Sequence, residues 1–316
     1  MSLNCTTLLQ DVAVIDSLRV MVQKEKTKIY RSSDYFVVGD QVTDSDRKKM
    51  VDWCYNIVDN CHFDRGNVAM AMQMIDRLLS KPGFPVRDFL NDRTEYQLLV
   101  MAALYTAIKV NERVEFESGL IASIANGLYG AKDIETAELA ILKGLGWRIY
   151  GPTSSQIAHH ILLLILPKAN LDKSTIGYIL IETQFQTECA VRDYFLSTKL
   201  PSTVALAAIL NALDQVDSGV CRDILFAFVT HNEYFERSLS DLLVARAGLA
   251  YIVEYLSFYE WSNDSNRTLD VGFVGDPSVP EMPSLANRRA EERFDDDITI
   301  NNVSPCDVAF WPGYNR

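Results

Sequence analysis

Residues 46–80 read DRKKMVDWCYNIVDNCHFDRGNVAMAMQMIDRLLS, and two helices can be read from them. The apolar residues of the first half recur at spacings of three and four, the period of one helix face: Met50, Trp53, Cys54, Ile57, Val58 and Cys61. A polar break follows at 62–66, and the second half carries a similar stripe: Val68, Met72, Ile75 and Leu79. If the two helices pack antiparallel, Arg47 at the start of the first meets Asp76 late in the second.

The same periodicity continues along the chain and predicts an all-α protein. One helix is expected at 8–24, followed by a linker and then by five helices at roughly 45–61, 66–80, 94–111, 117–128 and 133–146. After a glycine-rich break, a second set is expected at roughly 154–165, 172–191, 201–216, 219–231 and 237–258. The third helix of each set is rich in alanine, and small side chains let neighbouring helices approach on several sides. We therefore expect a distant internal duplication and four regions: 1–44, 45–150, 151–261 and 262–316.

Composition narrows the classes of function. The chain has 316 residues and a formal net charge of −12, which disfavours nucleic acid and anionic membrane surfaces as partners. No apolar run approaches the length of a membrane span, and the N-terminus lacks the pattern of a secretory signal. The six cysteines and four histidines show no spacing typical of a metal or redox site. We expect no cofactor, no metal, and reduced thiols, hence a location in the nucleus or the cytoplasm.

Two motifs within 46–80 resemble the opening of a cyclin box. They are Arg-x-x-x-Val-Asp-Trp, which begins at Arg47, and Ile-Asp-Arg-Leu-Leu-Ser, which contains Asp76. Further along, Leu98, Lys109 and Glu138 fall on the family's remaining signature positions, so all five occur in order. The resemblance covers about residues 8–256. It implies two five-helix cyclin folds and a protein that performs no chemistry but binds and activates a cyclin-dependent protein kinase, most readily one of the cell cycle.

The resemblance also implies roles for these residues. Arg47 and Asp76 are expected to form a structural ion pair, and Leu98 to lie in the core. Lys109 and Glu138 are expected to meet main-chain groups of the kinase through charge-assisted hydrogen bonds. The alternative for them is an ordinary intramolecular ion pair. The family's apolar kinase-facing surface is continued here by these residues, each of which alone is as easily core: Val110, Trp147, Ile149, Val14 and Leu18.

Many cell-cycle cyclins also carry a groove that captures Arg-x-Leu sequences of kinase substrates or inhibitors. By resemblance this groove involves Met50, Trp53 and Gln97. Asp46 and Lys49 occupy two of its apolar positions in this chain. We therefore expect Arg-x-Leu peptides to bind weakly or not at all.

The last segment, 262–316, differs in amino-acid composition from the rest of the chain. It holds five of the ten prolines, with ten acidic and five basic residues, which predicts a flexible tail. Ser304 precedes its only Ser/Thr-Pro bond and is a candidate phosphorylation site for a proline-directed kinase. The aromatic cluster Phe310, Trp311 and Tyr314 either docks on the body or binds a partner.

An alternative function belongs to a different class: a cyclin-fold transcription-associated or scaffold protein that acts without a kinase. The acidic balance and the intact Lys109 and Glu138 positions argue against it. An enzymatic function is less well supported than either of these, because the sequence contains no phosphate-binding glycine loop, no nucleophile–base arrangement and no metal motif.

Overall fold

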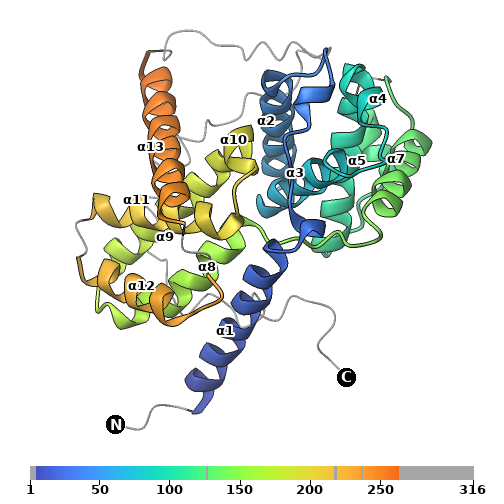
Figure 1. The fold of residues 1–316 in the computed structure, drawn as a ribbon. Helices are drawn as coiled ribbons and strands as arrows, with labels where there is room; N and C mark the ends of the chain where they lie inside the picture. The colour runs from blue at the N-terminus through green and yellow to red at the C-terminus, as the bar shows by residue number, and fades with distance from the viewer. Residues whose placement is uncertain (1–4, 126, 217–218, 236–237, 263–316) are drawn as a thin grey trace.

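The computed structural model describes residues 5–125, 127–216, 219–235 and 238–262, with side chains described from residue 11 to residue 254 of these ranges. All regular secondary structure in this part of the chain is helical, as Figure 1 shows. The expectation of an all-α fold is therefore confirmed.

The first repeat consists of α2 (Asp44–Asn60), α3 (Gly66–Leu79), α4 (Val86–Leu90), α5 (Arg93–Asn111), α6 (Ser118–Ser123) and α7 (Ala131–Gly144). Helix α5 runs through its centre, and Ala102, Ala103 and Ala107 on that helix are fully buried. Their small side chains leave room for α3 and α7 to pack closely on either side. The fourth expected helix, 117–128, is shorter than predicted: α6 ends at Ser123, and the chain then turns, with Gly127 at a φ of 80°.

The second repeat consists of α8 (Ser154–Ile165), α9 (Lys173–Arg192), α10 (Tyr194–Ser197), α11 (Pro201–Gln215), α12 (Gly219–His231) and α13 (Leu239–Ser262). Helix α11 takes the place that α5 has in the first repeat, and it packs against α8, α9 and α13. Pro201 lies in its first turn, where a missing N–H group costs no hydrogen bond. The short helices α4 and α10 were not expected from the sequence.

The N-terminal segment contacts both repeats. Helix α1 (Cys5–Glu25) packs on α8, as seen at the bottom of Figure 1, and its inward residues join the apolar core of the second repeat. Glu25 anchors the end of α1 by accepting hydrogen bonds from the backbone N–H and the hydroxyl of Ser202, at the start of α11. The linker then passes through η1 (Lys28–Tyr30) and η2 (Phe36–Val38) to the first repeat, whose core includes Tyr35 and Val42.

Candidate functional site

The predicted ion pair between α2 and α3 is present and buried. Arg47 donates from Nε to Asp76 Oδ1 at 3.1 Å and from Nη2 to Asp76 Oδ2 at 2.8 Å. The Tyr35 hydroxyl donates a third hydrogen bond to Asp76, at 2.7 Å. Burial lowers the pKa of Arg47, but the carboxylate of Asp76 outweighs that effect and leaves this pKa above its ordinary value. The pair therefore fixes how α2 and α3 lie against each other.

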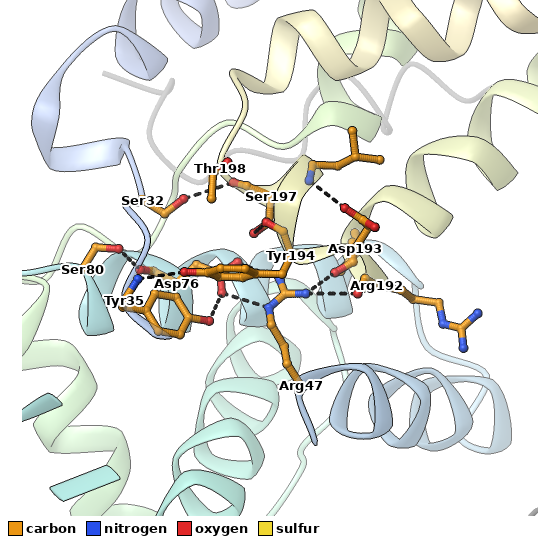
Figure 2. A network of polar contacts seen from close by, with 12 residues as sticks. Ser32, Tyr35, Arg47, Asp76, Ser80, Arg192, Asp193, Tyr194, Ser197 and Thr198 are labelled. Carbon is orange, nitrogen blue, oxygen red and sulfur yellow. Dashed lines mark hydrogen bonds and ion pairs between the residues drawn. The ribbon is translucent and has the colours of Figure 1, made fainter. Parts of the chain in front are cut away.

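Arg47 also joins the first repeat to the second. Its Nη1 donates to the carbonyl oxygen of Val191 at 2.7 Å, at the C-terminal end of α9. Figure 2 shows Arg47 beside Arg192, the last residue of this helix. A cation is favoured there, because the last carbonyls of a helix carry partial negative charge. The hydroxyl of Tyr194, just beyond α9, accepts from the backbone N–H of Tyr35 at 2.8 Å. The signature pair is thus part of a junction between α2, α3, the linker and the second repeat.

A second polar link between the repeats was missed from the sequence. Arg65, at the start of α3, donates from Nε to Glu188 Oε2 at 2.8 Å and also pairs with Asp59. The guanidinium of Arg65 lies over the ring of Tyr55, 4.3 Å from its centre. Arg65 and Glu188 are 123 residues apart and belong to no shared motif, so no local pattern relates them.

Lys109 and Glu138 meet on the surface of the first repeat. The Lys109 ammonium lies 3.1 Å from both carboxylate oxygens of Glu138, and the two side chains are 52% and 12% exposed. Partial burial lowers the pKa of Lys109, while the hydrogen bond and charge of Glu138 raise it and prevail. In the free chain the two residues therefore form the intramolecular ion pair that was the alternative to an interface, with the lysine half exposed and the carboxylate nearly buried.

Only some of the apolar positions expected around this pair reach the surface. Trp147 is 66% exposed and Val110 is also exposed, whereas Ile149 is buried in the core of the first repeat. Val14 and Leu18 were expected to face a kinase, but they are buried against the second repeat. That expectation is wrong for this structure, because the apolar stripe of α1 is covered by α8.

Trp147 has an unusual backbone conformation. Its φ is 63°, in the left-handed region that non-glycine residues rarely adopt, and it follows Gly146 at a φ of 59°. The backbone N–H of Trp147 donates to the carbonyl of Leu142 at 2.8 Å, which ends α7. The turn therefore holds a large aromatic side chain in solvent.

The expected Arg-x-Leu groove is not open in this structure. Met50 and Gln97 are buried, and Trp53 is partly buried against the core of the first repeat. Met50 faces inward because it shares the buried stripe of α2. Asp46 is also occupied: it accepts hydrogen bonds from the N–H and hydroxyl of Thr43, both at 2.9 Å, in the capping box of α2.

Two predicted residues remain, Leu98 and Ser304. Leu98 is partly buried and packs against the core of the first repeat. Ser304 and the tail at 263–316 lie outside the described residues. In the described part of the chain, no helix is both long and apolar enough to cross a membrane, and no three His, Cys, Asp or Glu side chains are grouped so that they can hold a metal ion.

Comparison with known proteins gives a consistent result. The family model described as "Cyclin, N-terminal domain" matches residues 16–150. G1/S-specific cyclin-D1 of Mus musculus is 24% identical over 213 residues, which cover 67% of this chain and 68% of that protein. Cyclin-D3-3 of Arabidopsis thaliana is 27% identical over 149 residues (46% and 39%), and G2/mitotic-specific cyclin-A1 of Caenorhabditis elegans is 25% identical over 205 residues (64% and 38%). The chain spans less than half of the length of these last two relatives.

Solved structures share the fold at low identity. A viral cyclin from herpesvirus saimiri superimposes with a TM-score of 0.57 and 11% identity, covering 78% of this chain and 99% of that one. A chain of the CAK complex from Chaetomium thermophilum, solved with ATP-gamma-S, gives a TM-score of 0.51 and 13% identity, with coverages of 79% and 78%.

Proposed function

This chain belongs to the cyclin family, and from that premise we propose that it binds and activates a cyclin-dependent protein kinase in control of the cell cycle. The family consists of regulatory proteins that are not catalysts. The observation that carries the proposal is the Lys109–Glu138 pair at the surface of the first repeat, with its half-exposed lysine and the exposed Val110 and Trp147 on the same repeat.

The pair is suited to exchange its partners on binding. The Lys109 side chain is half exposed and can leave the pair for another acceptor, whereas the nearly buried carboxylate of Glu138 then requires a new donor, which the kinase supplies. The freed ammonium then donates to main-chain carbonyl groups of the kinase, and the freed carboxylate accepts from main-chain N–H groups. Both kinds of hydrogen bond are charge-assisted and therefore stronger than neutral ones.

Trp147 supplies an apolar anchor for the same interface. A left-handed conformation costs a non-glycine residue roughly 1–2 kcal/mol, and the exposed ring recovers little of this by packing within the free chain. Tryptophan is among the residues that most often dominate binding energy when a partner buries them.

Activation then follows from differential affinity. A protein kinase requires a lysine–glutamate pair assembled in its own active site and an ordered activation loop. A partner that binds the competent arrangement more tightly shifts the kinase toward it. This role places the chain where the kinase is, in the nucleus or the cytoplasm, and allows kinase substrates or inhibitors as further partners.

The test is a binding and activation assay with purified cell-cycle and transcriptional cyclin-dependent kinases. The variant Lys109→Ala/Glu138→Ala is expected to lose kinase binding at nearly unchanged thermal stability. The matched control, Lys48→Ala/Asp44→Ala, removes a surface ion pair from α2 and should bind like the natural chain.

Two results would contradict the proposal at different levels. If the natural chain binds and activates no kinase of the panel, the function is wrong, and a scaffold role gains support. If the folded Lys109→Ala/Glu138→Ala variant still binds as the natural chain does, the site is wrong.

A further inference from the structure

The outward side of α13 is unusually apolar for a helix at a protein surface. Its inward side packs against α9 and α11, and Figure 1 shows its C-terminal part extending beyond the other helices of the second repeat. The exposed residues between 243 and 251 are all apolar: Leu243, Val244, Ala247, Ala250 and Tyr251. A surface helix normally carries charged and polar side chains on this side. We call these five residues the α13 face.

The α13 face has large side chains at its ends and a small one between them. Leu243, Ala247 and Tyr251 follow one another at steps of four, so they form one row along the helix. Leu243 is 53% exposed and Tyr251 is 69% exposed. The two lie about 12 Å apart along the axis, from the rise per residue of an α-helix. An aromatic ring above Ala247 can therefore contact both neighbours of that residue.

The charged residues of α13 around this face do not favour an ionic partner. Asp241 pairs with Lys199, and Arg246 pairs with Asp214. Glu254 is exposed and bounds the face at its C-terminal end. Large exposed apolar patches mark interaction sites, and here recognition must come from apolar contact rather than from charge.

The chain itself contains a segment of matching chemistry. Residues 308–314 read VAFWPGY, with three aromatic side chains and no charge, and they lie outside the described residues. Residues 263–307 connect this segment to the end of α13, and a polypeptide of that length has an average end-to-end distance of about 35–40 Å. Helix α13, with 24 residues, is about 36 Å long. The aromatic segment can therefore reach any point on the α13 face.

The covalent connection favours this segment over a second copy of the chain. Its local concentration at α13 is set by the length of the connection and not by the protein concentration. A second copy has to give up translational and rotational freedom when it binds. Tryptophan and tyrosine also bring a large contact area at a low cost in side-chain entropy.

We propose that residues 308–314 fold back and pack against the α13 face, with the ring of Trp311 above Ala247. In this position the ring contacts Leu243 and pairs with the ring of Tyr251, and no charged group is removed from water. The contact completes the second repeat from the C-terminal side of the chain. It goes beyond the proposed function and does not depend on kinase binding.

The test is fluorine NMR of the full chain labelled with 5-fluorotryptophan, in the presence of a soluble gadolinium chelate that broadens the signals of exposed rings. The signals of the four tryptophans are assigned from single Trp→Phe variants. Trp147, whose side chain is exposed, is the internal reference for an unprotected ring. Trp311 is expected to broaden several-fold less than Trp147, and equal broadening of the two would overturn the proposal.

Two variants of the α13 face test where Trp311 packs. Ala247→Glu places a charge under the docked ring, where it would lose its hydration, so Trp311 should broaden as strongly as Trp147. Leu243→Gln removes part of the apolar contact and should act in the same direction. Ala227→Glu, at an exposed alanine of α12, is the matched control and should leave Trp311 protected. Substitutions at exposed positions such as these change stability little.

The same spectra, recorded at a low and at a high protein concentration, distinguish the possible occupants. Protection of Trp311 that is independent of concentration is expected for a contact within one chain. Protection that grows with concentration would assign the contact to a second copy and overturn the proposal. The proposal also fails if Ala247→Glu leaves Trp311 protected, or if Ala227→Glu exposes it as strongly as Ala247→Glu does.

Discussion

The two repeats share an arrangement of helices but differ in their polar framework, by which we mean the buried charged side chains and their hydrogen bonds. The first repeat supplies three almost fully buried arginines, Arg47, Arg65 and Arg77. Helix α8, the counterpart of α2, reads SSQIAHHILLLI and has no arginine or lysine. The second repeat supplies acceptors to these arginines, such as the Val191 carbonyl and the Glu188 carboxylate, and one donor of its own, Arg192, to Asp52. The contacts between the two repeats are thus asymmetric, and they fix one relative orientation of the repeats.

The apolar cores differ in the same way. The buried residues of the first core come from one continuous part of the chain, from Tyr35 to Ile149, and Val191 and Tyr194 of the second repeat pack against them. The core of the second repeat also takes in Val14, Leu18, Met21 and Val22 of α1. The second repeat is therefore completed by a helix that lies before the first repeat in the sequence.

The largest effect is expected for Asp76→Ala. This change leaves Arg47 buried with no carboxylate and removes the acceptor of the Tyr35 hydroxyl, so the free energy of unfolding should fall by about 3–5 kcal/mol. Denaturant unfolding measures it. Asp52→Ala is the control: it breaks a more exposed pair with Arg192 and should cost about 0–1 kcal/mol. Similar losses of unfolding free energy for both variants would show that the buried ion pair contributes no more to stability than the more exposed one.

Leu18→Ala tests whether the second repeat depends on α1. Leu18 is fully buried, and a cavity at such a position costs roughly 2–4 kcal/mol. Val12→Ala, on the same helix but 55% exposed, should change stability by less than about 0.5 kcal/mol. If Leu18 faced a kinase instead, Leu18→Ala would weaken kinase binding and leave the unfolding curve unchanged.

Leu18 also shows which features of the structure the sequence alone could predict. The period of three and four along 46–80 and the later segments predicted the helices, and the spacing of Arg47 and Asp76 predicted their contact. Periodicity marks the buried face of a helix but does not name the element that covers it. For that reason Val14 and Leu18 were assigned to a kinase rather than to α8.

The contacts between the repeats could not be predicted from the sequence, for a different reason. Arg65 and Glu188 are far apart in the chain, and each alone is typical of a solvated surface charge. Met50 was placed in a groove by resemblance, although its own spacing to Cys54 and Val58 already indicated the core. The backbone conformation of Trp147 follows from how α7 ends, which composition does not reveal.

A smaller, pH-dependent effect is expected at Glu188. Burial raises the pKa of this carboxyl, and the nearby Arg65 offsets only part of the shift. A carboxyl with a higher pKa in the folded chain binds protons more tightly when folded. The free energy of unfolding should therefore decrease as the pH rises from about 4.5 through the folded pKa.

Glu188→Gln removes this titration but keeps an acceptor for Arg65. The variant should show a flatter pH dependence in that window, with a stability at neutral pH within about 1 kcal/mol of the natural chain. The exposed Glu117→Gln serves as control. An unchanged pH profile in Glu188→Gln would show that another group is responsible.

The smallest change in stability, with a large change in binding, is expected for Trp147→Gly. Glycine adopts a φ of 63° without steric cost, so relief of strain offsets the greater freedom of the unfolded chain, and stability should stay within about 1 kcal/mol. Trp147→Ala keeps the strained backbone and should be slightly less stable than Trp147→Gly.

Kinase affinity should fall at least tenfold in both Trp147 variants, because both lose a large apolar anchor. The second repeat offers a matched control in Phe226 on α12, which is 72% exposed. Phe226→Ala should bind the kinase normally if the interface belongs to the first repeat alone. Equal losses of affinity for Trp147→Gly and Phe226→Ala would mean that both repeats contact the kinase, and that the asymmetry of the polar framework does not extend to partner binding.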